Sequence, residues 1–118
     1  MLNPYSAQDR LEAQMAACVA AVQGEFRWLP LRDIVDPPHR QFDAALARQI
    51  ALHLLVRRFD VPKRRVVELQ ERSREAVNRA LRTVDERLSS PLFAQAYERM
   101  SAQARDLYAT EIINAEAA

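Results

Sequence analysis

Arginine and asparagine side chains recur near the start of a stretch with helical spacing in the second half of the chain. Arg74 and Asn78 are four residues apart and Arg79 follows, opposite an apolar face that includes Val77. Residues three or four apart lie on one face of a helix. Arginine can donate two hydrogen bonds to guanine, and asparagine pairs in the same way with adenine. The spacing therefore indicates a helix face with the chemistry to read base pairs.

Positive charge is concentrated around this stretch. The chain of 118 residues carries 17 Lys and Arg against 16 Asp and Glu, a net charge of +1. Residues 40–82 hold ten arginines and Lys63 against five acids, whereas acids outnumber bases in residues 1–39 and in residues 83–118. The planar guanidinium group suits phosphate and guanine better than the ammonium of lysine does. A basic middle favours an anionic partner, and the simpler alternative is a solvated charged surface.

The residues that other chemistries require are missing or badly spaced. Cys18 is the single cysteine and Gly24 the single glycine, which excludes an internal disulfide and a glycine-rich phosphate loop. His39 and His53 are not spaced with carboxylates as metal ligands, and Cys18 lies on an apolar helix face typical of a core. We therefore expect no enzymatic activity, no cofactor and no bound metal.

The chain contains no apolar run long enough to cross a membrane, which takes about 18 residues. Its first residues lack the basic start and apolar core of a signal peptide. We therefore expect a cytoplasmic protein without a membrane partner, associated with the nucleoid if its partner is DNA.

Apolar residues recur at steps of three and four along most of the chain, and no β-type alternation stands out. Ser6, Ser73 and Ser90 are expected N-caps, Pro91 follows the last of them, and Gly24 is the expected end of the first helix. The final residues, 111–118, are expected to fray. The sequence predicts a single all-α domain over residues 1–118 with about six helical elements, near 7–23, 31–35 (a brief turn), 42–59, 61–69, 73–88 and 91–114.

Residues 61–88 have the layout of a helix-turn-helix unit, followed by a C-terminal helix at about 90–115. No apolar residue occurs from Gln70 to Glu75, and this gap indicates a turn at about 70–72, although the glycine often found in such turns is missing. In this motif the second helix lies in the major groove of DNA and presents its N-terminal turns to the bases. The alternative is an ordinary helical hairpin with a polar outer face.

Two segments, Ala47–Leu54 (ARQIALHL) and Val77–Val84 (VNRALRTV), resemble the C-terminal duplex-binding domain of the bacterial replication initiator DnaA. The resemblance extends over roughly residues 8–108. It implies an all-α fold with a helix-turn-helix, of the kind found in domain IV of DnaA and in the Trp repressor, and double-stranded DNA as the partner. The ATPase domain of the initiator has no counterpart in this chain, so ATP-driven melting of DNA is not implied.

The resemblance assigns roles to individual residues. Arg48 and Gln49 match an Arg-Gln pair that holds DNA phosphates in the family, and Arg40 matches a loop arginine that enters the minor groove. The Asp-His-Thr residues that read the initiator box are replaced here by Ser73-Arg74-Glu75, so that box is not the implied target. The residues expected at the DNA are Arg40, Arg48, Gln49, Lys63, Arg64, Arg72, Ser73, Arg74, Glu75, Asn78 and Arg79.

Two functions follow from different classes of protein. The first is a stand-alone DNA-binding regulator of transcription or of replication initiation. The second is a protein-interaction adaptor that keeps the fold and has lost the DNA, for which Glu71 and Glu75 and the acidic flanking helices are the motivating residues. The acidic first or last helix could also provide a surface for a homodimer or for a partner protein, although neither shows a heptad seam.

Overall fold

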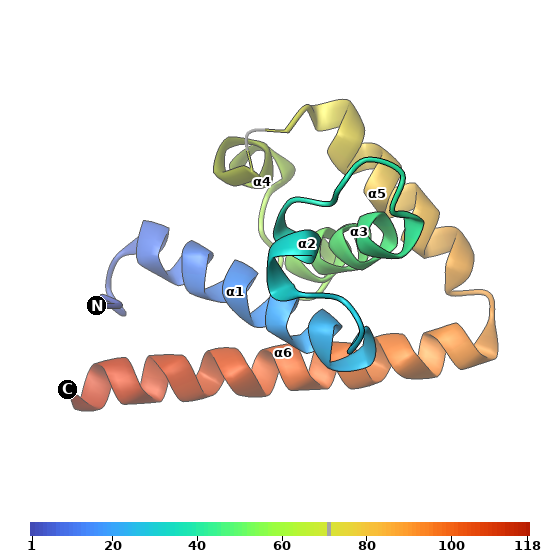
Figure 1. Cartoon of the computed structure of the whole chain (residues 1–118). Coiled ribbons are helices and arrows are strands. Elements are labelled where there is room, and N and C mark those ends of the chain that lie inside the picture. Colours follow the sequence, from blue (N-terminus) through green and yellow to red (C-terminus); the bar gives the residue numbers. More distant parts are fainter. Residues whose placement is uncertain (71) are drawn as a thin grey trace.

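Six α-helices and no strand make up the part of the chain that the computed structural model describes, residues 1–70 and 72–118, which confirms the predicted all-α class. The long helix α6 forms one side of the molecule with α1 beside it, and α4 and α5 lie on the opposite side, with α3 between them (Figure 1). The helices are α1 (Ala7–Glu25), α2 (Leu31–Val35), α3 (Phe42–Arg57), α4 (Lys63–Gln70), α5 (Arg74–Arg87) and α6 (Pro91–Ala117).

The predicted N-caps are confirmed. The Ser6 hydroxyl accepts a hydrogen bond from the Asp9 amide at 3.2 Å, and the Ser73 hydroxyl accepts one from the Ala76 amide at 3.0 Å. Each bond satisfies one of the amides that a helix leaves unpaired in its first turn. Ser90 is the N-cap residue of α6, but its side chain forms no cap hydrogen bond, and Pro91 opens the helix.

Three predicted helix ends were wrong. Gly24 does not end α1, because its φ angle is not positive and the helix continues to Glu25. The third helix ends at Arg57 rather than Phe59, because Asp60 adopts a left-handed φ of 55°. Residues 111–117 are helical, and Ala and Glu, which favour helices, predominate in this exposed end.

The segment from Leu31 to Val35, expected as a brief turn, is the five-residue helix α2. The helix that was expected from residue 61 begins at Lys63, since the Pro62 carbonyl accepts the first helical bonds from Arg65 and Val66 at 3.0 and 3.3 Å. α4 and α5 contact each other, and residues 71–73 separate them along the chain. Of the turn expected at 70–72, Gln70 is the last residue of α4, and residue 71 lies outside the described residues.

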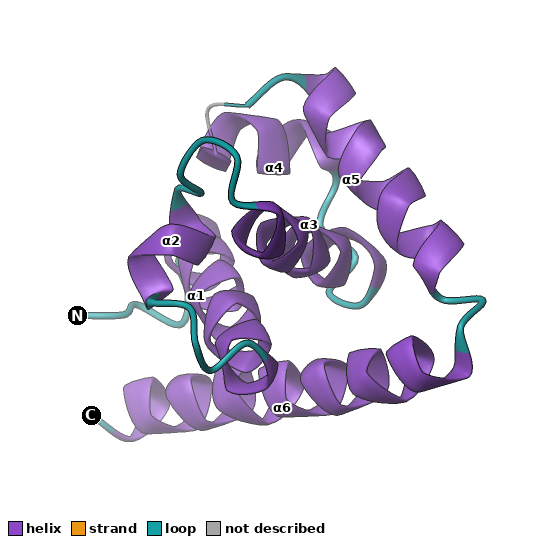
Figure 2. Cartoon of the chain, turned by 45° about the vertical axis from the view of Figure 1, so that its right-hand side comes forward, coloured by secondary structure: helices purple, strands orange, loops and turns teal. Residues whose placement is uncertain are grey.

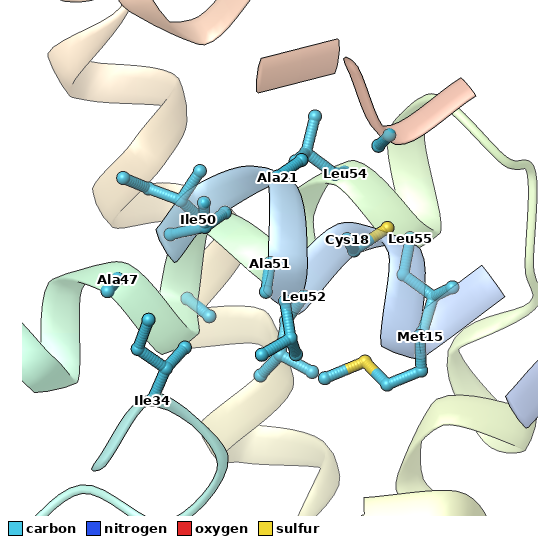
Figure 3. Close-up of a cluster of buried hydrophobic side chains, with 14 of the residues drawn as sticks. Met15, Cys18, Ala21, Ile34, Ala47, Ile50, Ala51, Leu52, Leu54 and Leu55 are labelled. Atoms are coloured by element: carbon cyan, nitrogen blue, oxygen red, sulfur yellow. The ribbon is translucent and has the colours of Figure 1, made fainter. Parts of the chain in front are cut away.

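The third helix is the centre of the fold. Every residue from Ile50 to Leu55 is buried, together with Ala44, Ala47 and Arg48 on the preceding turns. A helix that is buried on all sides must be surrounded by other elements, and α3 contacts α1, α2, α4 and α5 (Figure 2). Figure 3 shows Leu55 of α3 next to Cys18 and Met15 of α1, and Ile34 of α2 belongs to the same cluster. The thiol of Cys18 belongs to this cluster, and burial raises its pKa to about 12.

A buried histidine connects α3 to α5 and α6. His53 Nε2 lies 2.6 Å from Oδ1 of Asp85 on α5, and His53 Nδ1 lies 2.6 Å from the Tyr97 hydroxyl on α6. An ionised carboxylate only accepts hydrogen bonds, so Nε2 carries the proton and donates to Asp85. In the neutral imidazole Nδ1 then accepts from the Tyr97 hydroxyl. Both ring nitrogens are therefore paired, as a buried polar group requires.

The charge state of His53 follows from its surroundings. Burial lowers the pKa of His53 below its ordinary value, while the Asp85 carboxylate opposes this shift and the guanidinium groups of Arg57 and Arg58 add to it. The same hydrogen bond with His53 lowers the pKa of Asp85. Burial also raises the pKa of Tyr97 to about 12, so its hydroxyl remains protonated. At neutral pH the pair therefore consists of a neutral imidazole and a carboxylate.

This arrangement predicts a fold that weakens in mild acid. In the unfolded chain His53 takes up a proton as the pH falls through the ordinary histidine pKa of about 6.5. In the folded chain its pKa is lower, so His53 stays neutral in this range and the fold loses stability as the pH falls. Urea denaturation should give a lower free energy of unfolding at about pH 5.5 than at about pH 7.5. The variant His53→Gln should lose about 1–3 kcal/mol at neutral pH and show a smaller pH dependence. Equal stability of the natural chain at both pH values would contradict the proposed protonation state.

Candidate nucleic-acid interface

Four of the residues expected at DNA lie around one pocket between α3 and α5. The pocket has a volume of about 240 Å³, and Arg48 and Gln49 of α3 face Arg79 of α5 and Arg72 of the preceding connection. The local sequence explains the opening, because Ala76 and Ala80 of α5, which lie next to Arg79, are too small to fill this space. The other lining residues are Pro37, Ala45 and Leu52.

Arg48 lies below the surface of this pocket. Only 7% of the residue is exposed, and its guanidinium group donates hydrogen bonds to the Val35 carbonyl oxygen at the end of α2 and to Oε1 of Gln70 at the end of α4. Burial lowers the pKa of Arg48, and the positive charge of Arg72 lowers it further, while Asp36 opposes the shift. Arg48 therefore ties three helices together. The exposed phosphate contact that the resemblance assigned to Arg48 does not fit this position.

The two more exposed arginines of the pocket form single ion pairs. Arg72 lies 3.4 Å from Asp36, whose side chain is 86% exposed, and Arg79 lies 3.7 Å from Glu75, four residues earlier on α5. Exposed pairs of this kind contribute about 0–1 kcal/mol and are screened by salt. Both guanidinium groups can therefore exchange their carboxylate for a phosphate at little cost.

The residues expected to contact bases from the first turns of α5 differ in how accessible they are to a ligand. Arg74 is exposed and forms no ion pair with any residue that the structure describes. The Ser73 hydroxyl is already used as the N-cap. Asn78 is half-buried, and its Oδ1 is buried without a hydrogen-bond partner among the described residues. Among these residues, Arg74 and Arg79 are the side chains best placed to reach a ligand beyond the helix.

The remaining expected contacts lie away from the pocket. Arg40 is exposed in the loop between α2 and α3, where its φ of 65° is left-handed and strained for a residue other than glycine. Lys63 and Arg64 lie at the start of α4, whereas the pocket adjoins its end. The neighbouring Arg65 reaches the Ala7 carbonyl oxygen of α1 at 3.5 Å. The structure therefore does not bring these three cations together with the pocket arginines.

Sequence reasoning missed the residues that hold Arg48 in place. Gln70 and the Val35 carbonyl accept its hydrogen bonds, and Asp36 compensates the charge of the neighbouring Arg72. Gln70 was assigned to the turn because it starts the gap in the apolar pattern, and no local signal indicates its bond to a residue 22 positions earlier. Asp36 precedes Pro37 in a segment that was expected only to break the chain.

Arg48 and Arg79 line the same pocket but should differ in their effect on folding. The variant Arg48→Met should lower the free energy of unfolding by about 1–3 kcal/mol, since it leaves the buried acceptors of Val35 and Gln70 without a donor. Arg79→Met removes an exposed pair and should change stability by about 0.5 kcal/mol or less. Urea denaturation of both variants measures the difference. Equal losses would contradict the structural role of Arg48.

Comparison with known proteins does not identify a relative: no family model, no curated protein and no solved structure matches this chain. Within the part of the chain that the structure describes, no helix combines the length and the apolar composition needed to span a membrane. Nor do His, Cys, Asp and Glu side chains of these residues gather in a group of three or more that could hold a metal ion. The basic pocket and the exposed face of α5 are therefore the features of the described residues that bear on function.

Proposed function

We propose that this chain is a sequence-specific double-stranded-DNA-binding protein that regulates transcription or replication initiation without an ATPase activity. The observation that carries the proposal is the pocket between α3 and α5, where Arg48, Arg72 and Arg79 converge from separate parts of the chain. Arg72 and Arg79 pair with carboxylates only through weak, exposed contacts. A phosphate group would compensate these charges better than the single carboxylates do.

The electrostatics of the pocket support an anionic ligand. The charge of Arg72 lowers the pKa of Arg48, which means that the two guanidinium groups repel each other within the pocket. An anion held between Arg72 and Arg79 would reduce this repulsion, while Arg48 keeps its bonds to the Val35 carbonyl oxygen and Gln70. Gln49 adds a side-chain amide at the same place. Phosphates of a DNA backbone are the natural anions of this size for a basic protein surface.

The shape of α5 supports placement in a major groove. Its buried face, which includes Val77, Leu81 and Val84, packs on the core, and its opposite face exposes Arg74, Glu75, Arg79 and Arg82. A major groove is wide enough to admit an α-helix. Residues 71–73 alone separate α4 from α5 along the chain, and in the proposed helix-turn-helix the first turns of the second helix would meet the bases. Figure 1 shows α5 at the edge of the molecule, away from α1.

Arg74 is the proposed base-reading residue, and Arg72, Arg79 and Gln49 are the proposed phosphate contacts. Asn78 can contribute only its amide nitrogen to such a contact, because its side-chain oxygen is buried. Arg40, Lys63 and Arg64 are proposed as peripheral backbone contacts. The resemblance to the duplex-binding domain of DnaA supports this assignment in outline. Its box-reading residues are replaced here, so we propose a target different from the initiator box.

The adaptor remains the second candidate because of one observation. Arg72 and Arg79 both have carboxylate partners, Asp36 and Glu75, so both charges are paired even when no DNA is bound. An adaptor would show no affinity for DNA at low ionic strength, where electrostatic binding is strongest. The two functions are therefore distinguished by one measurement on the purified chain.

The double variant Arg72→Ala/Arg79→Ala should weaken binding to a random-sequence duplex about tenfold or more. The slope of the logarithm of the binding constant against the logarithm of the salt concentration should become shallower by the equivalent of about two phosphate contacts. Fluorescence anisotropy with a labelled duplex at about 50 mM salt and above measures both quantities. The matched control is Arg32→Ala/Arg105→Ala, which removes the same charge from exposed positions on α2 and α6 and should change the affinity less than about twofold. No binding by the natural chain at low salt would support the adaptor instead.

Arg74→Ala should act on sequence preference rather than on general affinity. Selection of bound duplexes from a random pool should give one preferred sequence for the natural chain. On that sequence Arg74→Ala should lose about 1–3 kcal/mol of binding free energy, because one bidentate contact to a base is removed. On unrelated duplexes the loss of binding free energy should be much smaller. Equal losses on all duplexes would assign Arg74 to the backbone.

A further inference from the structure

A second hollow lies on the acidic side of the molecule, between α1 and the C-terminal half of α6. It has a volume of about 610 Å³, and Leu31 of α2 and the first two residues of the chain complete its wall. Figure 1 shows α1 and α6 running side by side in this region. We call this hollow the α1–α6 groove; its lining residues are Met1, Leu2, Asp9, Glu12, Ala13, Ala16, Ala17, Ala20, Leu31, Leu107 and Glu111.

The floor of the groove suits a helix. Its four alanines, Ala13, Ala16, Ala17 and Ala20, follow the spacing of one helix face along two turns of α1. The distance between two packed helices depends on the side chains at their contact, so alanines permit close approach. Leu107 of α6 and Leu31 of α2 add larger apolar side chains to the lining. A helix laid along such a groove would anchor itself with apolar residues at similar spacing.

The rim of the groove specifies the charge of its occupant. Asp9, Glu12 and Glu111 line it, and no Lys or Arg is among its described lining residues. Glu12 and Glu111 are exposed, and the one side-chain contact of Glu12 among the described residues is with Gln8, at 3.1 Å. A second copy docking through the same acidic surfaces would bring like charges together, which costs free energy. The complementary occupant is a positively charged one.

We propose that the α1–α6 groove binds an amphipathic α-helix of a partner protein, with apolar residues against the alanine floor and Lys or Arg at the three carboxylates. The groove shares no lining residue with the basic pocket between α3 and α5. The two surfaces can therefore be occupied together. This inference is independent of DNA binding, since it holds equally for a regulator that recruits a partner and for an adaptor.

The test uses a helical probe peptide of about 14 residues that carries Leu at positions i, i+3, i+4 and i+7 and Lys elsewhere, and a twin with Glu in place of Lys. Isothermal titration calorimetry with the whole chain should detect binding of the Lys peptide and none of the Glu peptide. Amide signals of Ala13, Ala16 and Ala20 should shift in NMR spectra as the Lys peptide is added. Higher salt should weaken the binding.

Two charge-matched double variants locate the binding site. Glu12→Lys/Glu111→Lys should lower the affinity for the Lys peptide about tenfold or more. Glu68→Lys/Glu86→Lys, at exposed positions outside the groove, should lower this affinity less than about threefold. Equal weakening by both pairs, binding of the Glu peptide, or no binding of the Lys peptide would overturn the proposal. Self-association of the natural chain in sedimentation equilibrium, abolished by the groove variant, would overturn it in favour of a second copy as the occupant.

Discussion

The arrangement of the other helices depends on the burial of α3. A helix that is buried on every side cannot leave a polar side chain unpaired, because an unpaired polar group in an apolar surrounding costs about 1–3 kcal/mol. α3 carries two such side chains, Arg48 and His53. Arg48 is satisfied by the ends of α2 and α4, and His53 by Asp85 on α5 and Tyr97 on α6. Hydrogen bonding by these two residues therefore positions four of the five remaining helices.

The candidate interface is a consequence of this packing. The bonds of Arg48 hold the end of α4 next to the end of α2, and so bring Arg72 beside Asp36 and close to Arg79. The pocket thus contains one cation that serves the fold and two that remain available to a ligand. Arg48 and Gln49 are adjacent in the sequence but differ in the structure, because Arg48 is buried and bonded to the ends of two other helices whereas Gln49 is only half-buried in the pocket lining.

Charge is separated across the fold in the same way as along the chain. Three arginines of the middle segment, Arg48, Arg72 and Arg79, line the pocket beside α5, while the groove between α1 and α6 is lined by carboxylates from both acidic ends. Two surfaces of opposite charge suit two partners of different chemistry. A protein that binds DNA through one surface and a basic helix through the other would connect the two without a change in its own fold.

The sequence by itself determined the helical class, the N-caps at Ser6 and Ser73 and the basic character of the middle segment. These features depend on side chains and amides within a few residues of one another, or on composition alone. The tertiary structure alone decided that Arg48 is buried and that the oxygen of Asn78 points inward. The acceptors of Arg48 lie 13 and 22 residues away along the chain, and His53 finds its partners 32 and 44 residues away. Burial and pairing over such separations arise only when the helices pack, so no local pattern contains them.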